Sequence, residues 1–167
     1  MPNNSTPLKR LSDDLRLPWM ITWGMALLLL GYLAFAYIYG AKLSTDFSYT
    51  EVQRINLRTV LYWVAILTLP LTNLIRHIQL RLNQTMPTAT PAKSRYCLTV
   101  LVSMLLCESI ALYGLLLFCL GDGFNTLIIF MSLSALGLFL YRPKLLEYRA
   151  VVAALAEKHL ARSSDSI

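Results

Sequence analysis

Four apolar stretches, each long enough to cross a lipid bilayer as a helix, alternate with polar connections along the chain. They cover residues 19–39, 59–78, 97–120 and 124–141. A hydrocarbon core of about 30 Å requires roughly 20 predominantly apolar residues in a helix, and all four stretches are close to that length. The pattern predicts an all-α integral membrane protein, a four-helix bundle made of two helical hairpins, with residues 19–141 as its transmembrane domain.

The connections between these stretches are rich in helix-breaking or polar residues. Segment 84–96 is rich in Pro and Thr and separates the two hairpins, and the Gly-Asp-Gly run at 121–123 supplies the flexible backbone of a tight reversal. Segment 40–58 is a mixed polar connection. Pro70 lies inside the second stretch, where its ring removes a backbone donor and leaves the carbonyl of Ile66 free, so we expect a kink there.

The two ends of the chain have a different pattern. Residues 1–18 form a polar N-terminal segment in which charge alternates with leucine over 8–17, typical of a short surface helix that stops at Pro18 or of a solvated leader. Residues 142–167 hold an amphipathic helix, because apolar residues recur every three or four positions after Pro143. Its apolar stripe can lie on the membrane, fold onto its own bundle or pair with another chain.

Composition agrees with a membrane protein. Hydrophobic residues make up 56% of the chain, charged residues 14%, and the mean hydropathy is +0.55, whereas a soluble domain would be more polar. The net charge of +6 comes from basic residues that flank the apolar stretches without forming one patch, which argues against nucleic acid as a partner. The expected partners are the lipid bilayer and other membrane protein subunits or further copies of this chain.

The basic residues are divided unequally between the two sides of the predicted bundle. Of the 15 Lys and Arg, only Lys42, Arg54 and Arg58 lie in the connection after the first stretch. All others lie in the two terminal segments, at the end of the second stretch and in the connection between the hairpins, which share the opposite side. Cytoplasmic loops are enriched in Lys and Arg, so we expect an inner (plasma) membrane protein with both termini in the cytoplasm.

One carboxylate, Glu108, lies near the middle of the third stretch. Burying it in ionised form would cost roughly 2.5–3.5 kcal/mol or more, so we expect it to be protonated, paired or bound to a cation. A salt bridge is disfavoured because the central parts of the four stretches contain no Lys or Arg. The candidate helix partners at its depth are Thr68 and Ser134, and Ser109 and Tyr113 lie near it on its own helix.

Small residues form a ridge on the same predicted helix. Ser103, Cys107, Ala111 and Gly114 recur at intervals of three and four and therefore share one face. Such ridges let helix backbones approach closely, so this face is predicted to pack against another helix. Glu108 lies about 100° around the helix from Cys107, at the edge of the ridge.

Other candidate chemistry is sparse. Cys97, Cys107 and Cys119 show no close pair of the zinc or redox kind, and His77 and His159 lie outside the apolar centres, which disfavours a haem held between helices. The sequence shows no nucleophile elbow, phosphate loop or carboxylate pair. We therefore expect no enzymatic activity and no bound metal or cofactor.

Residues 106–114, LCESIALYG, resemble the ion-binding helix of the proteolipid c subunit of rotary ATPases. The family's pattern is a mid-membrane Glu followed by a small residue and then an aromatic residue, and in sodium-binding members a Ser directly follows the Glu. The resemblance implies that Glu108 is the ion-carrying carboxylate and Ser109 a hydroxyl ligand. It also implies that the Tyr113 ring holds the carboxylate in place and that Leu106 provides a backbone-carbonyl ligand.

Three classes of function remain open. The favoured class is a non-catalytic accessory, assembly or scaffold component, in which Glu108 holds helices together. The alternative is a proton- or sodium-handling transporter subunit or proteolipid-like module, in which Glu108 loads and unloads the ion. An enzyme acting on lipid or quinone is ranked last, because one buried acid does not make an active site.

Overall fold

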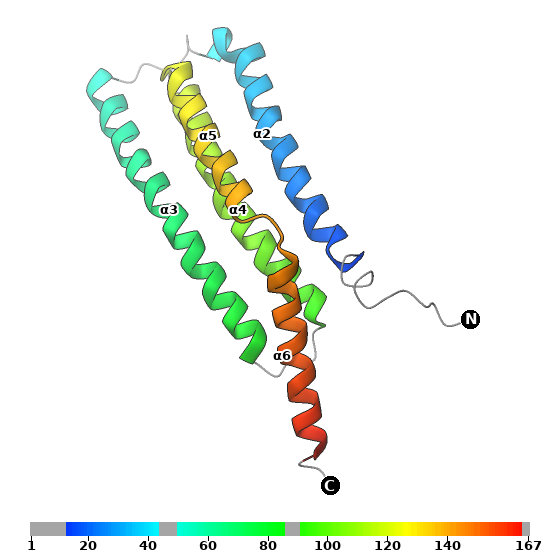
Figure 1. The fold of residues 1–167 in the computed structure, drawn as a ribbon. Helices are drawn as coiled ribbons and strands as arrows, with labels where there is room; N and C mark the ends of the chain where they lie inside the picture. The colour runs from blue at the N-terminus through cyan, green and yellow to red at the C-terminus, as the bar shows by residue number, and fades with distance from the viewer. Residues whose placement is uncertain (1–12, 44–49, 86–90, 165–167) are drawn as a thin grey trace.

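The chain is described by a computed structural model that places residues 13–43, 50–85 and 91–164, without side-chain detail for 41–43 and 158–164. All regular elements in these ranges are helices, which confirms the all-α class (Figure 1). The helices are α2 (Arg16–Leu43), α3 (Glu51–Thr85), α4 (Ala92–Cys119), α5 (Phe124–Leu140) and α6 (Leu145–Ser164).

Three of these helices, α2, α3 and α4, are long and apolar enough to cross a membrane. The fourth candidate consists of α5 and α6 taken as one span that is bent by 45° at the break between them. Helix α5 alone has 17 residues, at the short end of what crosses a bilayer. Its bounds nevertheless agree with the predicted stretch 124–141.

The helices extend beyond the apolar stretches. Helix α2 begins at Arg16 and includes Pro18 in its first turn. Asp13 and Asp14 are helical and Leu15 is a turn residue, so a helix break precedes this proline. A proline in the first turn of a helix removes no hydrogen bond, because the first amides of a helix have no intrahelical acceptor. Helix α3 begins at Glu51 inside the predicted polar connection and continues through Pro70 as one helix. The predicted surface helix over 8–17 falls mainly on residues outside the described ranges.

Of the two predicted hairpins, the structure forms the second and not the first. Helices α4 and α5 pack along each other as a hairpin, α3 packs on one side of α4, and α2 packs on the other (Figure 1). In the described residues α2 and α3 have no extensive contact with each other, so the prediction that they form a packed hairpin is wrong. Helix α6 follows α5 and contacts α3 and α4, which supports the own-bundle alternative for this amphipathic helix.

The small-residue ridge explains why α4 and α5 lie so close together. Ser103, Cys107, Ala111 and Gly114 are all buried, as predicted. A Cβ atom added to Gly114 would lie 2.5 Å from the Cβ of Phe130, and one added to Gly137 would lie 2.7 Å from the Sγ of Cys107. Both glycines therefore allow a backbone approach that a larger residue would prevent.

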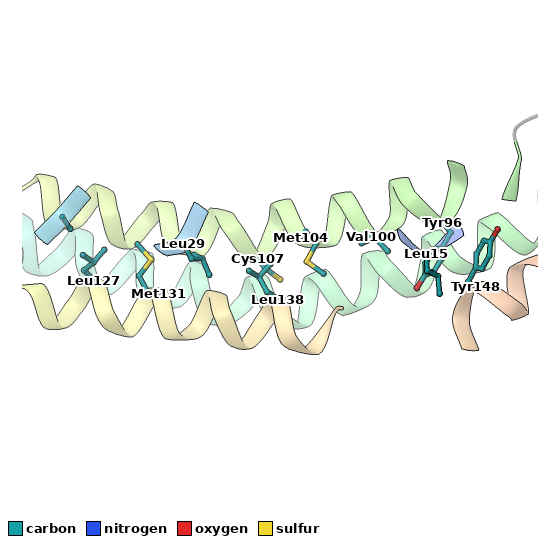
Figure 2. Close-up of a cluster of buried hydrophobic side chains, with 12 residues drawn as sticks. Leu15, Leu29, Tyr96, Val100, Met104, Cys107, Leu127, Met131, Leu138 and Tyr148 are labelled. Carbon is teal, nitrogen blue, oxygen red and sulfur yellow. The ribbon is translucent and has the colours of Figure 1, made fainter. Parts of the chain in front are cut away.

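A cluster of buried apolar side chains runs the length of this contact. Figure 2 shows it extending from Leu127 through Cys107 and Leu138 to Tyr96 and Tyr148 at the other end. Helix α2 contributes Leu29 and Ala36 to the same cluster. The core is thus centred on α4, and each of the other helices reaches it from a different side.

The tight turn between α4 and α5 is formed as predicted. Gly121 has φ +88°, a left-handed conformation that glycine adopts at little cost. Arg54 of α3 donates a 2.8 Å hydrogen bond from Nη1 to the Gly121 carbonyl, and Arg58 pairs with Asp122 at 3.3 Å. Two of the three basic residues expected on this side therefore hold the turn.

Candidate functional site

Glu108 lies near the middle of α4 and is buried. It is 3% exposed, and in the described residues neither carboxyl oxygen has a hydrogen-bond partner. Tyr32, Leu29 and Ala36 of α2 belong to the apolar cluster that Met104 and Leu115 of α4 join. Met104 and Leu115 lie within about 40° of Glu108 around the helix, so the carboxyl group is on the side of α4 that α2 covers, about 100° from Cys107.

The two predicted helix partners do not bind the carboxyl group. Ser134 of α5 donates its hydroxyl to the backbone carbonyl of Cys107 at 2.8 Å, which confirms that it lies at the depth of Glu108. Thr68 instead donates to the carbonyl of Val64 in its own helix at 2.7 Å. Both hydroxyl donors are thus used by backbone carbonyls.

The residues implied by the proteolipid resemblance are not gathered around Glu108. The Ser109 hydroxyl donates to the Leu106 carbonyl at 2.7 Å, so two of the implied ligands bind each other. Tyr113 lies about 140° around the helix from Glu108 and packs with Ala65 of α3 in a second apolar cluster. A local cation site of the implied composition is not assembled in the described residues.

Tyr32 is the neighbour that sequence reasoning missed. It is the hydroxyl-bearing residue in the central part of stretch 19–39, which is the one signal that could have drawn attention to it. The sequence did not show that α2 packs against α4, however, so no reason existed to place Tyr32 beside Glu108.

A second set of polar side chains, here called the break network, surrounds the connection between α5 and α6, where the helix is interrupted. Arg76 of α3 is 4% exposed and donates to the Tyr141 carbonyl at 2.8 Å and to Glu147 at 2.7 Å. The Tyr96 hydroxyl donates to the Lys144 carbonyl at 3.1 Å and accepts from the Lys144 amide at 2.8 Å. The network joins α3 and α4 to the start of α6.

The N-terminal end of the described chain is attached to the same region. The Tyr148 hydroxyl donates to Asp14 at 2.9 Å, and Lys93 pairs with Asp14 at 3.1 Å. Burial and the hydrogen bond to the Asp14 carboxylate raise the pKa of Tyr148 to about 12, so this hydroxyl stays protonated at neutral pH. The start of the described chain therefore contacts the first turns of α4 and α6.

The chemistry available at Glu108 is that of a single carboxyl group. In ranges 13–43, 50–85 and 91–164 no three His, Cys, Asp or Glu side chains lie together in a way that would hold a metal ion. A protonated carboxyl group offers one donor and further acceptor capacity, enough to bind a hydroxyl or a polar group of another helix. Comparison with protein-family models, with curated proteins and with solved structures finds no match for this chain.

Proposed function

We propose that the chain is a multi-pass protein of the inner (plasma) membrane with four crossings. This is supported by the large apolar side chains that α2 and α3 expose along their whole length, which water would solvate poorly. On α2 they include Met20, Trp23, Leu27, Leu30 and Ile38, and on α3 Val60, Trp63, Leu67, Leu71 and Leu74. Lipid or other membrane helices would cover these surfaces.

Both termini are proposed to be cytoplasmic. The side with few basic residues has Lys42, Arg54 and Arg58, and the contacts of Arg54 and Arg58 with the turn give these two a structural role. The other Lys and Arg residues lie toward the opposite end of the helices. The positive-inside rule assigns that end to the cytoplasm.

Within the membrane we assign the chain a non-catalytic accessory, assembly or scaffold role. The observation that carries this proposal is the position of Glu108 at the α2–α4 contact, with both carboxyl oxygens unpartnered among the described residues. A protonated carboxyl group at this place can bind a polar group of α2 or of a partner helix. Such bonds between membrane helices contribute about 1 kcal/mol each.

Two substitutions at Glu108 test the assembly role. Glu108→Gln keeps the shape and hydrogen-bonding capacity of a protonated carboxyl, so complexes should survive in mild detergent on native gels. Glu108→Leu removes that capacity and should release the partner subunit or copy. Glu157→Gln, at an exposed acid on α6, is the matched control. Complexes that persist in Glu108→Leu would contradict the proposal.

A second candidate, proton handling, is favoured by the same two carboxyl oxygens, which have no hydrogen-bond partner among the described residues. A hydrophobic carbodiimide reacts with protonated carboxyl groups in apolar sites, so it distinguishes an exchanging acid from a sealed one. Fast labelling of Glu108 that slows as pH rises would support proton exchange. Labelling that also slows with added sodium would extend it to that ion, and absence of labelling would leave the assembly role.

A further inference from the structure

A groove of about 680 Å³ lies between α2 and α5. Its walls are almost entirely apolar, and its volume lies within the range of about 300–1,000 Å³ that is usual for ligand sites. Leu29, Leu30 and Leu33 of α2 and Ile128, Ala135 and Leu138 of α5 line it.

One end of the groove differs chemically from the rest. It is lined there by Trp19 and Trp23 near the start of α2, by Phe139 near the end of α5 and by Arg142 in the connection to α6. The guanidinium group of Arg142 lies 4.5 Å from the centre of the Phe139 ring and is exposed. In the described residues Arg142 has no acidic partner, whereas Arg16, Arg58 and Arg76 each pair with a carboxylate.

The end of α5 is also prepared electrostatically for an anion. The last carbonyls of a helix carry partial negative charge and would repel a phosphate group. Arg76 donates to the carbonyls of Tyr141 and Arg142 at 2.8 and 3.5 Å, so these carbonyls are already hydrogen-bonded. The positive charge of Arg142 therefore remains available at the mouth of the groove.

We propose that this groove binds one anionic phospholipid, with its acyl chains between α2 and α5 and its phosphate at Arg142. The inference rests on the membrane location proposed above. Basic pockets between helices at the cytoplasmic side bind anionic headgroups, and Trp rings prefer the headgroup level.

Native mass spectrometry of the full chain in detergent tests the headgroup contact. Phosphatidylglycerol should be retained in preference to phosphatidylcholine with the same acyl chains. Arg142→Gln should lower phosphatidylglycerol retention about fivefold and leave phosphatidylcholine unchanged, since one basic residue near the surface contributes about that factor. Arg81→Gln is the matched control, because Arg81 is an exposed arginine on α3 outside the groove.

A second pair of variants tests the apolar part of the groove. Ala135→Phe fills the space between α2 and α5 and should reduce retention of both lipids. Ala34→Phe adds the same ring at an exposed position of α2 that does not line the groove, and it should change neither. This pair keeps the test decisive if Arg142→Gln is poorly expressed.

The following results would overturn the lipid site. One is equal retention of the two lipids by the wild-type chain, and another is equal phosphatidylglycerol retention by Arg142→Gln and Arg81→Gln. A third is a dimer that Ala135→Phe dissociates, because the groove would then bind a second copy of the chain. Extraction of the wild-type chain from membranes by alkaline carbonate is measured separately. Extraction would contradict the membrane proposal, whereas lost lipid selectivity in a chain that resists extraction would contradict the lipid site alone.

Discussion

Glu108 and Glu147 are two carboxylates of the same domain in opposite surroundings. Glu147 has a carboxyl oxygen 2.7 Å from Arg76 and also accepts from the Tyr96 hydroxyl at 3.4 Å. Glu108 is more deeply buried, and its oxygens have no partner in the described residues. The Glu147 side chain is 23% exposed and pairs with the buried guanidinium group of Arg76, so Glu147 has a structural role. Glu108 lacks such a pairing in the described residues, which makes it the candidate for function.

The largest test of this contrast removes the cation from the break network. Arg76→Met leaves Glu147 and the Tyr141 carbonyl without their donor, and it should lower the free energy of unfolding by about 3–5 kcal/mol. Unfolding in a detergent titration measures this loss. Arg81→Met is the control on the same helix and should change stability little. A loss below about 1 kcal/mol for Arg76→Met would mean that the network does not have this structural role.

The next test should have the opposite sign. Glu108→Leu replaces an unpartnered polar group by an apolar one of similar length, so the isolated chain should gain about 1–3 kcal/mol in unfolding free energy. The same variant is expected to lose its partner, so stability and assembly should change in opposite directions. A Glu108→Leu chain that is less stable than wild type would show that the carboxyl group has an internal partner.

A smaller effect is expected from pH at the edge of the break network. The pKa of Tyr148 is raised to about 12 in the folded chain, above its ordinary value near 10. Its contribution to stability is therefore complete below about pH 10 and is lost as pH rises toward 12. Tyr148→Phe should remove this part of the alkaline transition in a pH series of melting temperatures. An unchanged transition in Tyr148→Phe would contradict the assignment.

The smallest effect is expected at the turn, where a third carboxylate pairs with a more exposed arginine. Asp122 accepts from Arg58 at 3.3 Å, and the Arg58 side chain is 39% exposed. Asp122→Asn should therefore reduce the unfolding free energy by at most about 1 kcal/mol, and added salt should mask the difference. A salt-independent loss of several kcal/mol would place this pair in the same class as Arg76 and Glu147.

Local features were readable from the sequence. The turn at Gly121, the bounds of α5 and the ridge of Cys107 and Gly114 depend on residues within a few positions of one another, and all three are present in the structure. The ends of α3 were predicted less well. Polarity indicates where a helix leaves an apolar layer, but a polar residue such as Glu51 does not by itself end a helix.

Features that join distant parts of the chain were not readable. Arg76 and Glu147 are 71 positions apart, and the sequence around either residue gives no signal that the two form a pair. Tyr32 was missed for the same reason, since its position beside Glu108 requires α2 to pack on α4. Apolar surfaces that look alike fit several neighbours, so the sequence predicted a packed α2–α3 hairpin where the structure has α4 and α5 between them.

The separation of α2 from its sequence neighbour has a consequence for synthesis. Helix α2 ends at Leu43, but α4, which covers its inner face, is complete only at Cys119. At roughly 5–20 residues per second a ribosome needs about 4–15 s to make the intervening chain. During that interval α2 cannot pack against α4. Lipid or the insertion machinery must therefore cover the surface of α2 that later packs beside Glu108.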